Sequence, residues 1–259
     1  MVHSDLFRAS PFVPRTADRG RALATHRELL CGLGVRLRVA AFNYQFTRQL
    51  ATDLRTAAVE VGPLGDFLRD HWALERTFDP VFSFLTDEKV DGVPPESGLF
   101  VAFGERSGFP GVAAHGGAIL MYGADITSLT MLHLAELEGD GPLYRYDKDF
   151  EGPVIDWHGR AVPVRYRYHV RPLGRRLVYD WVGIERLLEN NGVLRWIDGD
   201  RRSLGFVLDG RALVDTLTTA LGEDPLCLLD AESRSWVAPE IERLGRRFVI
   251  GDFEPVSAS

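Results

Sequence analysis

Two short apolar segments flanked by glycine constrain the fold of this chain more than any other feature: SGLFVAFG at 97–104 and GAILMYG at 117–123. Apolar runs of this length, without polar alternation, are typical of strands in sheets that are covered on both faces. Helical spacing of apolar residues recurs along the rest of the chain, over 18–31, 62–71, 127–138, 181–192 and 211–225. This alternation predicts an α/β fold in which helices cover both faces of a mixed central sheet.

The segment VIDWHGRAVPVRYRYHV at 154–170 has a turn signal, WHGR, between two β-like arms. It predicts an antiparallel hairpin added to the main sheet. Asp18 is suited to cap the first helix, and the Asn191-Gly192 pair to end the one that begins near 181. No internal repeat, low-complexity tract or convincing linker is present, so we expect one domain over residues 1–259.

Composition describes an ordinary globular protein, with 45% hydrophobic and 26% charged residues among 259. No apolar stretch approaches the 18 residues that a transmembrane helix needs, and the N-terminus lacks the features of a signal peptide. A net charge of −7 disfavours nucleic acid as a partner. Cys31 and Cys227 lie far apart in apolar contexts, which indicates buried thiols in a reducing compartment. We therefore expect a cytoplasmic protein without nucleic-acid or membrane partners.

Several common catalytic and cofactor motifs are absent. The sequence has no GxxxxGK[ST] loop, no GxGxxG after a strand and no GxSxG elbow. Its 7 histidines show neither HxxxH nor HxH spacing, so no metal site is expected.

The segment TSLTMLHLAE at 127–136 follows the second apolar strand directly. If a helix begins at Thr127, then Thr130, His133 and Glu136 share one face, which points towards the carboxyl end of the strands. Ligands of open α/β sheets bind at that edge. His133 has two interpretations at this point, a general base or a core histidine that has found a hydrogen bond.

The turn FGERS at 103–107 ends the first apolar strand. If the two apolar strands are neighbours, Glu105 lies at the same sheet edge as His133. A carboxylate that accepts one ring N–H fixes the tautomer and leaves the other nitrogen as a base. The alternative for Glu105 is a surface glutamate in a loop.

A series of motifs along the chain resembles the aminoglycoside 3-N-acetyltransferase family, in the family's order. They are MVHSDLFRA at 1–9, VAAFNYQF at 39–46, the long segment from DLRTAAVEVG to FDPVFSF at 53–84, FGERS at 103–107, TMLHLAE at 130–136, and GFVLDGRALVDTLTTALGEDPLCLL at 205–229. The resemblance implies an antibiotic N-acetyltransferase-like α/β fold and transfer of an acetyl group from acetyl-CoA, the co-substrate, to a primary amine. It implies direct attack by the amine, with His133 as general base and Glu105 as its orienting carboxylate.

The same resemblance implies the binding residues. Those placed near the CoA face are Ser4, Asn43, Thr56 and Ser83. Contacts to the acceptor amine are expected from Glu136 and Asp180; the alternative for Glu136 is to cap the polar strip beside His133. The partners are then a small-molecule amine and an acyl-CoA, and the protein is expected to be a monomer or a homodimer.

The sequence also departs from the family pattern. Asp5 replaces a serine, Ala40-Ala41 replaces Pro-Thr, and Asp79 replaces the histidine of the H-P-x-x-S motif. The run GADITSLTM at 123–131 is closer to the branch of the family that acts on amino sugars other than aminoglycosides. The stretch YHVRPLGRRLVYD at 168–180 is basic where resistance enzymes are acidic.

Three functions therefore remain open. The leading one is a CoA-dependent N-acyltransferase for an aminosugar or a natural-product intermediate, with the length of the acyl group undecided. The others are aminoglycoside inactivation and a degenerate homologue that binds CoA without catalysis. The arginines Arg171, Arg175 and Arg176 favour an anionic acceptor, such as a nucleotide-linked aminosugar, or else form a solvated loop.

Overall fold

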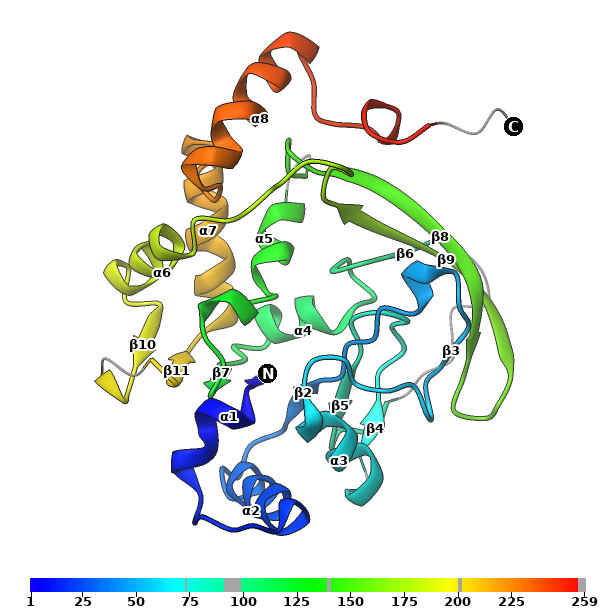
Figure 1. The fold of residues 1–259 in the computed structure, drawn as a ribbon, viewed down its shortest axis with the longest axis vertical. Helices are drawn as coiled ribbons and strands as arrows, with labels where there is room; N and C mark the ends of the chain where they lie inside the picture. Colours follow the sequence, from blue (N-terminus) through cyan, green and yellow to red (C-terminus); the bar gives the residue numbers. More distant parts are fainter. Residues whose placement is uncertain (73, 91–98, 139–140, 200–201, 256–259) are drawn as a thin grey trace.

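The computed structural model describes residues 1–72, 74–90, 99–138, 141–199 and 202–255, which form two β-sheets with helices around them (Figure 1). The larger sheet has the strand order β10-β11-β7-β1-β2-β5-β4. Its strands are β1 (Val2–Ser4), β2 (Arg38–Ala40), β4 (Glu75–Arg76), β5 (Phe84–Thr86), β7 (Ile119–Tyr122), β10 (Leu194–Trp196) and β11 (Leu204–Val207). β7, β1 and β2 are parallel to one another, and the outer strands join them antiparallel.

The smaller sheet has the order β3-β8-β9-β6. It consists of β3 (Thr52–Asp53), β8 (Tyr146–Ile155), β9 (Ala161–Val170) and β6 (Leu99–Val101). β8 and β9 are the long curved hairpin in Figure 1, which confirms the hairpin predicted over 154–170 and extends its first arm.

The strand β7 shows why a wholly apolar segment belongs at the centre of this fold. Its side chains alternate between two cores, with Ile119 and Met121 on one face and Leu120 and Tyr122 on the other. The first face packs against α4 (Gly108–Ala114), α5 (Leu132–Leu137) and α7 (Gly210–Glu223), and the second against α2 (Arg19–Cys31) and α3 (Pro63–His71). The predicted mixed sheet with helices on both faces is confirmed.

The other apolar segment lies elsewhere than expected. β6 pairs in parallel with β9 in the smaller sheet and is not a neighbour of β7, while residues 97 and 98 fall outside the described residues. The long hairpin offers a free edge to β6, and sequence pattern alone does not reveal which edge a short apolar strand joins. The condition under which Glu105 would share an edge with His133 is therefore not met.

Most predicted helices are found, including α2 with its Asp18 cap, α3, α7 and α6 (Trp181–Asn190). The helix predicted over 127–138 is shorter: a 3₁₀ turn at Ile126–Ser128 is followed by α5, which begins only at Leu132. Asp125 caps that turn, because its carboxylate accepts from the Thr127 N–H and hydroxyl. The sequence did not predict α8 (Ala231–Leu244), whose interior contains Pro239.

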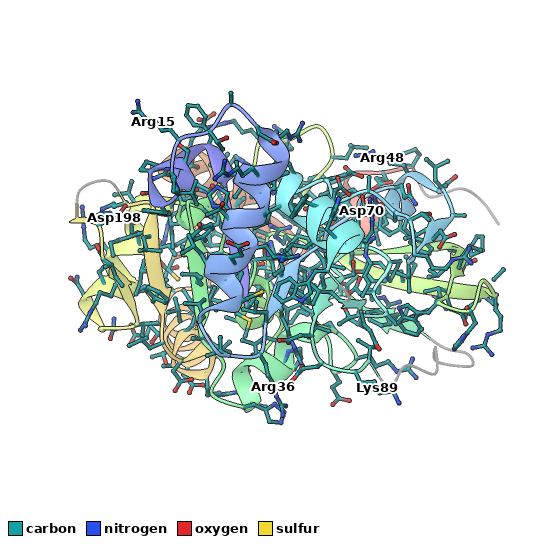
Figure 2. The ribbon with its side chains drawn as sticks, turned by 90° about the horizontal axis from the view of Figure 1, so that it is seen from below. Arg15, Arg36, Arg48, Asp70, Lys89 and Asp198 are labelled. Carbon is teal, nitrogen blue, oxygen red and sulfur yellow. The ribbon has the colours of Figure 1, made fainter. Side chains whose placement is uncertain are left out.

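The remaining short elements are α1 (Leu6–Ala9) and the 3₁₀ turns Ser10–Phe12, Phe46–Arg48 and Ile250–Asp252. The prediction of two buried thiols was wrong, since Cys31 is exposed and Cys227 is only partly buried. Charged side chains such as Arg15, Lys89 and Asp198 lie around the periphery (Figure 2). No helix among the described residues has both the length and the apolar character needed to cross a membrane.

Gly123, the residue that follows β7, is a position where the fold requires glycine. Its φ is +75°, and a Cβ atom there would lie 1.9 Å from the Asp5 carbonyl oxygen and 2.8 Å from the Ala9 nitrogen. Gly123→Ala is expected to lower the free energy of unfolding by about 2–4 kcal/mol, measured by urea denaturation, because backbone strain and overpacking add.

Gly174→Ala is the matched control for this substitution. Gly174 also has a positive φ, +73°, but nothing lies within 4 Å of its added Cβ. Only backbone strain destabilises this variant, so we expect its free energy of unfolding to fall by about 1–2 kcal/mol. Equal losses in the two variants would contradict the close approach at Gly123.

Candidate active site

His133 lies in α5, just beyond the carboxyl end of β7, and faces a pocket of about 400 Å³. The imidazole side chain is 15% exposed. The pocket is rich in aromatic side chains and is lined by Tyr44, Phe82, Thr127, Leu129, Thr130, His133, Arg145, Tyr168, Val170, Arg171, Tyr179 and Trp181. The Leu129–Met131 segment between the 3₁₀ turn and α5 thus places Thr130 and His133 on the pocket wall.

The partner of the His133 ring is Glu136, three residues later in the same helix. His133 Nδ1 lies 2.6 Å from Glu136 Oε2. Because an ionised carboxylate can only accept, Nδ1 carries the proton in this contact. Nε2 is then the unprotonated ring nitrogen and is available to a molecule in the pocket.

Glu136 is fully buried and satisfied by groups from three other segments. Its Oε1 accepts hydrogen bonds from the hydroxyls of Tyr144, at 2.7 Å, and Tyr179, at 2.5 Å. The Arg145 Nε atom lies 3.6 Å from Oε2, and the His169 Nε2 atom lies 3.5 Å from it. We call Glu136, Arg145, Tyr144, Tyr179 and His169 the carboxylate cluster.

Charges within the carboxylate cluster are balanced. Burial raises the pKa of Glu136, but the Arg145 charge and the hydrogen bonds outweigh this and hold that pKa well below its ordinary value. Burial lowers the pKa of His133 to about 4, against the pull of Glu136, and it also lowers the pKa of His169. Near neutral pH the Glu136 carboxylate and the Arg145 guanidinium are therefore charged, while the imidazoles of His133 and His169 are neutral.

Four cluster residues were missed by the sequence analysis: Tyr144, Arg145, His169 and Tyr179. Arg145 donates to the Tyr179 hydroxyl at 2.6 Å and to the His169 carbonyl at 3.1 Å, so it ties the start of β8 to β9 and to the loop before α6. The only sequence signal is the presence of these polar residues within the apolar contexts LYRYD and YRYHV. Nothing in their spacing relates them to α5.

Three side chains at this site could also be considered as metal ligands. Within the described part of the chain, His133, Glu136 and His169 each offer a ligand atom within 4.8 Å of the others. The nearby Arg145 guanidinium opposes a divalent cation at this point, and both Glu136 oxygens already accept hydrogen bonds. We interpret the group as a cluster of polar contacts around the Glu136 carboxylate; the expected absence of a metal stays a prediction.

Glu105 does not take the position expected for it. It is exposed, and no hydrogen bond or ion pair of its side chain is found among the described residues, whereas Glu136 occupies the site beside His133 Nδ1. The FGERS turn reaches the site through Phe103 instead, whose ring lies 5.0 Å from that of His133. Phe103 adopts φ +62°, a conformation that turns the chain back sharply after β6.

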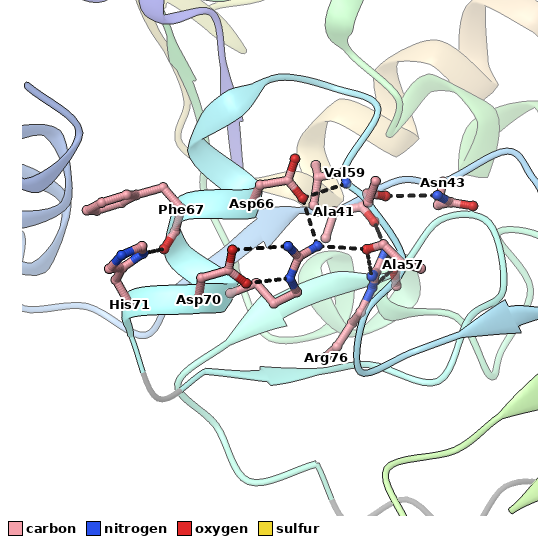
Figure 3. A network of polar contacts seen from close by, with 12 residues as sticks. Ala41, Asn43, Ala57, Val59, Asp66, Phe67, Asp70, His71 and Arg76 are labelled. Carbon is pink, nitrogen blue, oxygen red and sulfur yellow. Dashed lines mark hydrogen bonds and ion pairs between the residues drawn. The ribbon is translucent and has the colours of Figure 1, made fainter. Parts of the chain in front are cut away.

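Ser83 bonds the buried Arg76 side chain, and Asn43 lies beside the network around Arg76 (Figure 3). The buried Arg76 guanidinium donates to Ser83 Oγ at 2.8 Å and to the carbonyls of Ala57 and Ala41 at 2.6 and 2.5 Å. Asn43 donates to the Ala58 carbonyl at 2.8 Å and accepts from the Gln45 N–H at 3.0 Å. Both side chains hold the loop that carries Tyr44 and neither lines the pocket.

The other predicted binding residues also lie outside the pocket. Ser4 ends β1, and Thr56 is exposed in the turn after β3. Asp180 caps α6, because its carboxylate accepts from the Gly183 N–H at 2.9 Å. Glu136 has no exposed side-chain surface, which fits its alternative role beside His133 better than a contact to the acceptor amine.

The sequence and the fold together define a class, the CoA-dependent N-acetyltransferases. The chain belongs to the aminoglycoside 3-N-acetyltransferase family, whose sequence profile matches residues 36–221. Comparison with curated protein sequences gives no match.

Solved structures resemble this chain in fold. The aminoglycoside acetyltransferase AAC-IIIb, in a binary complex with CoASH, is 20% identical with a TM-score of 0.62, over 86% of this chain and 88% of that one. A mutant of AAC(3)-IVa in complex with apramycin is 20% identical with a TM-score of 0.59, over 87% and 85%. The YokD protein from Bacillus subtilis is 14% identical with a TM-score of 0.61, over 86% and 91%.

Removing the cation of the carboxylate cluster tests its charge balance. Arg145→Gln leaves the Glu136 charge buried without its guanidinium, so we expect the free energy of unfolding to fall by about 3–5 kcal/mol in urea denaturation. Arg175→Gln is the control, since Arg175 is exposed and its guanidinium carbon lies 5.7 Å from the centre of the Trp236 ring. We expect this substitution to lower the free energy of unfolding by about 1 kcal/mol or less. A small effect at Arg145 would mean that Glu136 is not held as an anion.

Proposed function

We propose that the chain transfers an acetyl group from acetyl-CoA to the primary amine of a small molecule, with His133 as general base. The observation that carries this proposal is the geometry of His133. Its ring is neutral, faces a pocket, and has Nδ1 held 2.6 Å from a buried carboxylate. A histidine with a structural role only has no need for a free Nε2 on a pocket wall.

The reaction is a direct transfer. The amine nitrogen attacks the thioester carbon, a C–N bond forms, and the C–S bond breaks. Attack makes the nitrogen strongly acidic, so even the weakly basic His133 imidazole can accept its proton at Nε2. The resulting imidazolium is stabilised by Glu136, and its proton can then pass to the departing CoA sulfur. No covalent acyl-enzyme is required.

Family membership supports acetyl-CoA as the donor, as does the binary complex of AAC-IIIb with CoASH. The family profile covers 36–221, and the structural likenesses extend over 86% to 87% of the chain. We therefore propose that residues 1–259 act as one acyltransferase domain. Glu136 takes the orienting role in this proposal, in place of Glu105.

Three substitutions test the assignment of the base and its carboxylate. His133→Ala and Glu136→Gln are each expected to lower kcat by about 10²–10⁴-fold in a thiol-release assay with acetyl-CoA, since general base catalysis is lost or the tautomer is no longer fixed. Glu105→Gln, which changes an exposed side chain away from the pocket, is expected to keep wild-type kcat.

Circular dichroism on the same preparations separates loss of catalysis from loss of fold. Wild-type turnover in a folded His133→Ala variant would remove His133 from the mechanism. A large loss in Glu105→Gln together with an active Glu136→Gln would restore the pairing inferred from sequence. Failure of the wild-type protein to bind acetyl-CoA in calorimetry would refute the proposed function itself.

The pH dependence provides an independent check. Because burial lowers the pKa of His133 to about 4, the base remains unprotonated throughout the neutral range. After correction for the fraction of neutral amine, kcat/KM is expected to be flat between about pH 5.5 and 8. An inflection between about pH 6 and 7, the range of an ordinary imidazole, would show that the His133 pKa is not lowered.

A further inference from the structure

The pocket in front of His133 has an unusual balance of charge. Among its described lining residues there are two arginines, Arg145 and Arg171, and no aspartate or glutamate. Its other walls are largely aromatic, from Tyr44, Phe82, Tyr168, Tyr179 and Trp181. A site of this composition attracts anions and stacks rings, and it offers a polycation nothing to pair with.

The two arginines differ in how their charges are met. Arg145 is buried within the carboxylate cluster, where Glu136 balances it. Arg171 lies at the pocket and is exposed, with its guanidinium carbon 5.9 Å from the centre of the Tyr179 ring. No carboxylate oxygen of the described residues lies within 4.0 Å of an Arg171 nitrogen, so its charge is available to a ligand.

The two arginines that follow Arg171 in sequence do not share its position. Arg175 packs over the Trp236 ring at 5.7 Å. Arg176 pairs with Glu232 and lies 3.6 Å from Asp230. Of the three arginines in this segment, Arg171 therefore lies at the pocket. Arg175 and Arg176 lie on the surface beside α8.

Carboxylates near the pocket are already engaged. Asp125 precedes the lining residue Thr127 and pairs with Arg8 at 3.1 Å. Glu60, beside Tyr44, pairs with Arg48 at 3.0 Å. The Asp180 carboxylate accepts from the N-terminus of α6. Each of these carboxylates thus already has a cationic or backbone N–H partner, whereas an anionic acceptor can approach Arg171 directly.

We infer that the acceptor is a ring-bearing primary amine that also carries an anionic group, a phosphate or a carboxylate, and that Arg171 binds this anion. This inference rests on the proposed acetyl transfer. The planar guanidinium matches the oxygens of either anion bidentately. The ring stacks on the aromatic wall, and the amine reaches His133 Nε2. Arg171 is thus a specificity-determining residue, and aminoglycosides are poor acceptors because they repel it.

The test compares acceptors that share one sugar ring and differ in charge, with a polycation beside them. With acetyl-CoA saturating, kcat/KM is measured by thiol release for glucosamine 6-phosphate, glucosaminuronic acid, glucosamine and the polycation kanamycin A. One or both anionic sugars should exceed glucosamine by about 10-fold to 100-fold, the usual range for a charge-assisted contact, and kanamycin A should be the poorest. The phosphate and carboxylate sugars distinguish the two anions.

Arg171→Gln then assigns the effect to one residue. In this variant the ratio of kcat/KM for the better anionic sugar to that for glucosamine should fall about 10-fold to 100-fold. Arg175→Gln, the matched control from the same basic run, should keep the wild-type ratio. An unchanged ratio in Arg171→Gln with a raised KM for acetyl-CoA would overturn the inference, because Arg171 would then serve the phosphates of CoA.

Other outcomes also decide the matter. A higher kcat/KM for kanamycin A than for the anionic sugars contradicts the inference while leaving acetyl transfer intact. A second contradicting outcome is a protein that acetylates another amine but does not acetylate the anionic sugars. In that case calorimetry would also detect no binding of these sugars to the CoA-loaded protein. Absence of acetyl-CoA binding and of all turnover is the separate failure of the proposed function.

Discussion

The buried carboxylate of Glu136 is the group on which the site depends. An ionised carboxylate without exposed surface is stable only if charge and hydrogen bonds replace water, and Arg145, Tyr144 and Tyr179 supply both. These partners come from the residues just before β8 and from the loop before α6, both outside α5. Satisfying one carboxylate therefore draws the hairpin, α5 and α6 together around the pocket.

The same arrangement sets the chemistry available to His133. Because burial lowers the pKa of His133, the ring stays neutral at physiological pH, yet the Glu136 carboxylate still fixes the proton on Nδ1. A neutral imidazole in a pocket that is largely aromatic suits proton transfer from an amine as it attacks an acyl group. Arg171 is the one lining charge that this balance leaves open among the described residues. The proposed reaction and the proposed acceptor preference thus rest on different residues.

A second buried ion, the Arg76 guanidinium, stabilises the part of the pocket wall that includes Tyr44. It donates to the Ala41 and Ala57 carbonyls (Figure 3) and to Ser83 Oγ, and so holds the loop that leads to Tyr44. Motif residues that we expected at the CoA face, such as Ser83 and Asn43, belong to this scaffold. A motif in register shows that residues share a fold, but it does not reveal whether a side chain meets a ligand or a carbonyl.

The sequence by itself determined the central strand β7, most of the helices, the hairpin and the family, and it singled out His133 as the candidate base. These follow from local signals, namely apolar periodicity, caps and short motifs, which need no knowledge of distant residues. Only the tertiary structure decided that β6 joins the hairpin, and that Glu136, not Glu105, meets His133. Strand pairing and the partners of a buried charge depend on segments that fold together from far apart. Local sequence patterns do not indicate these long-range contacts.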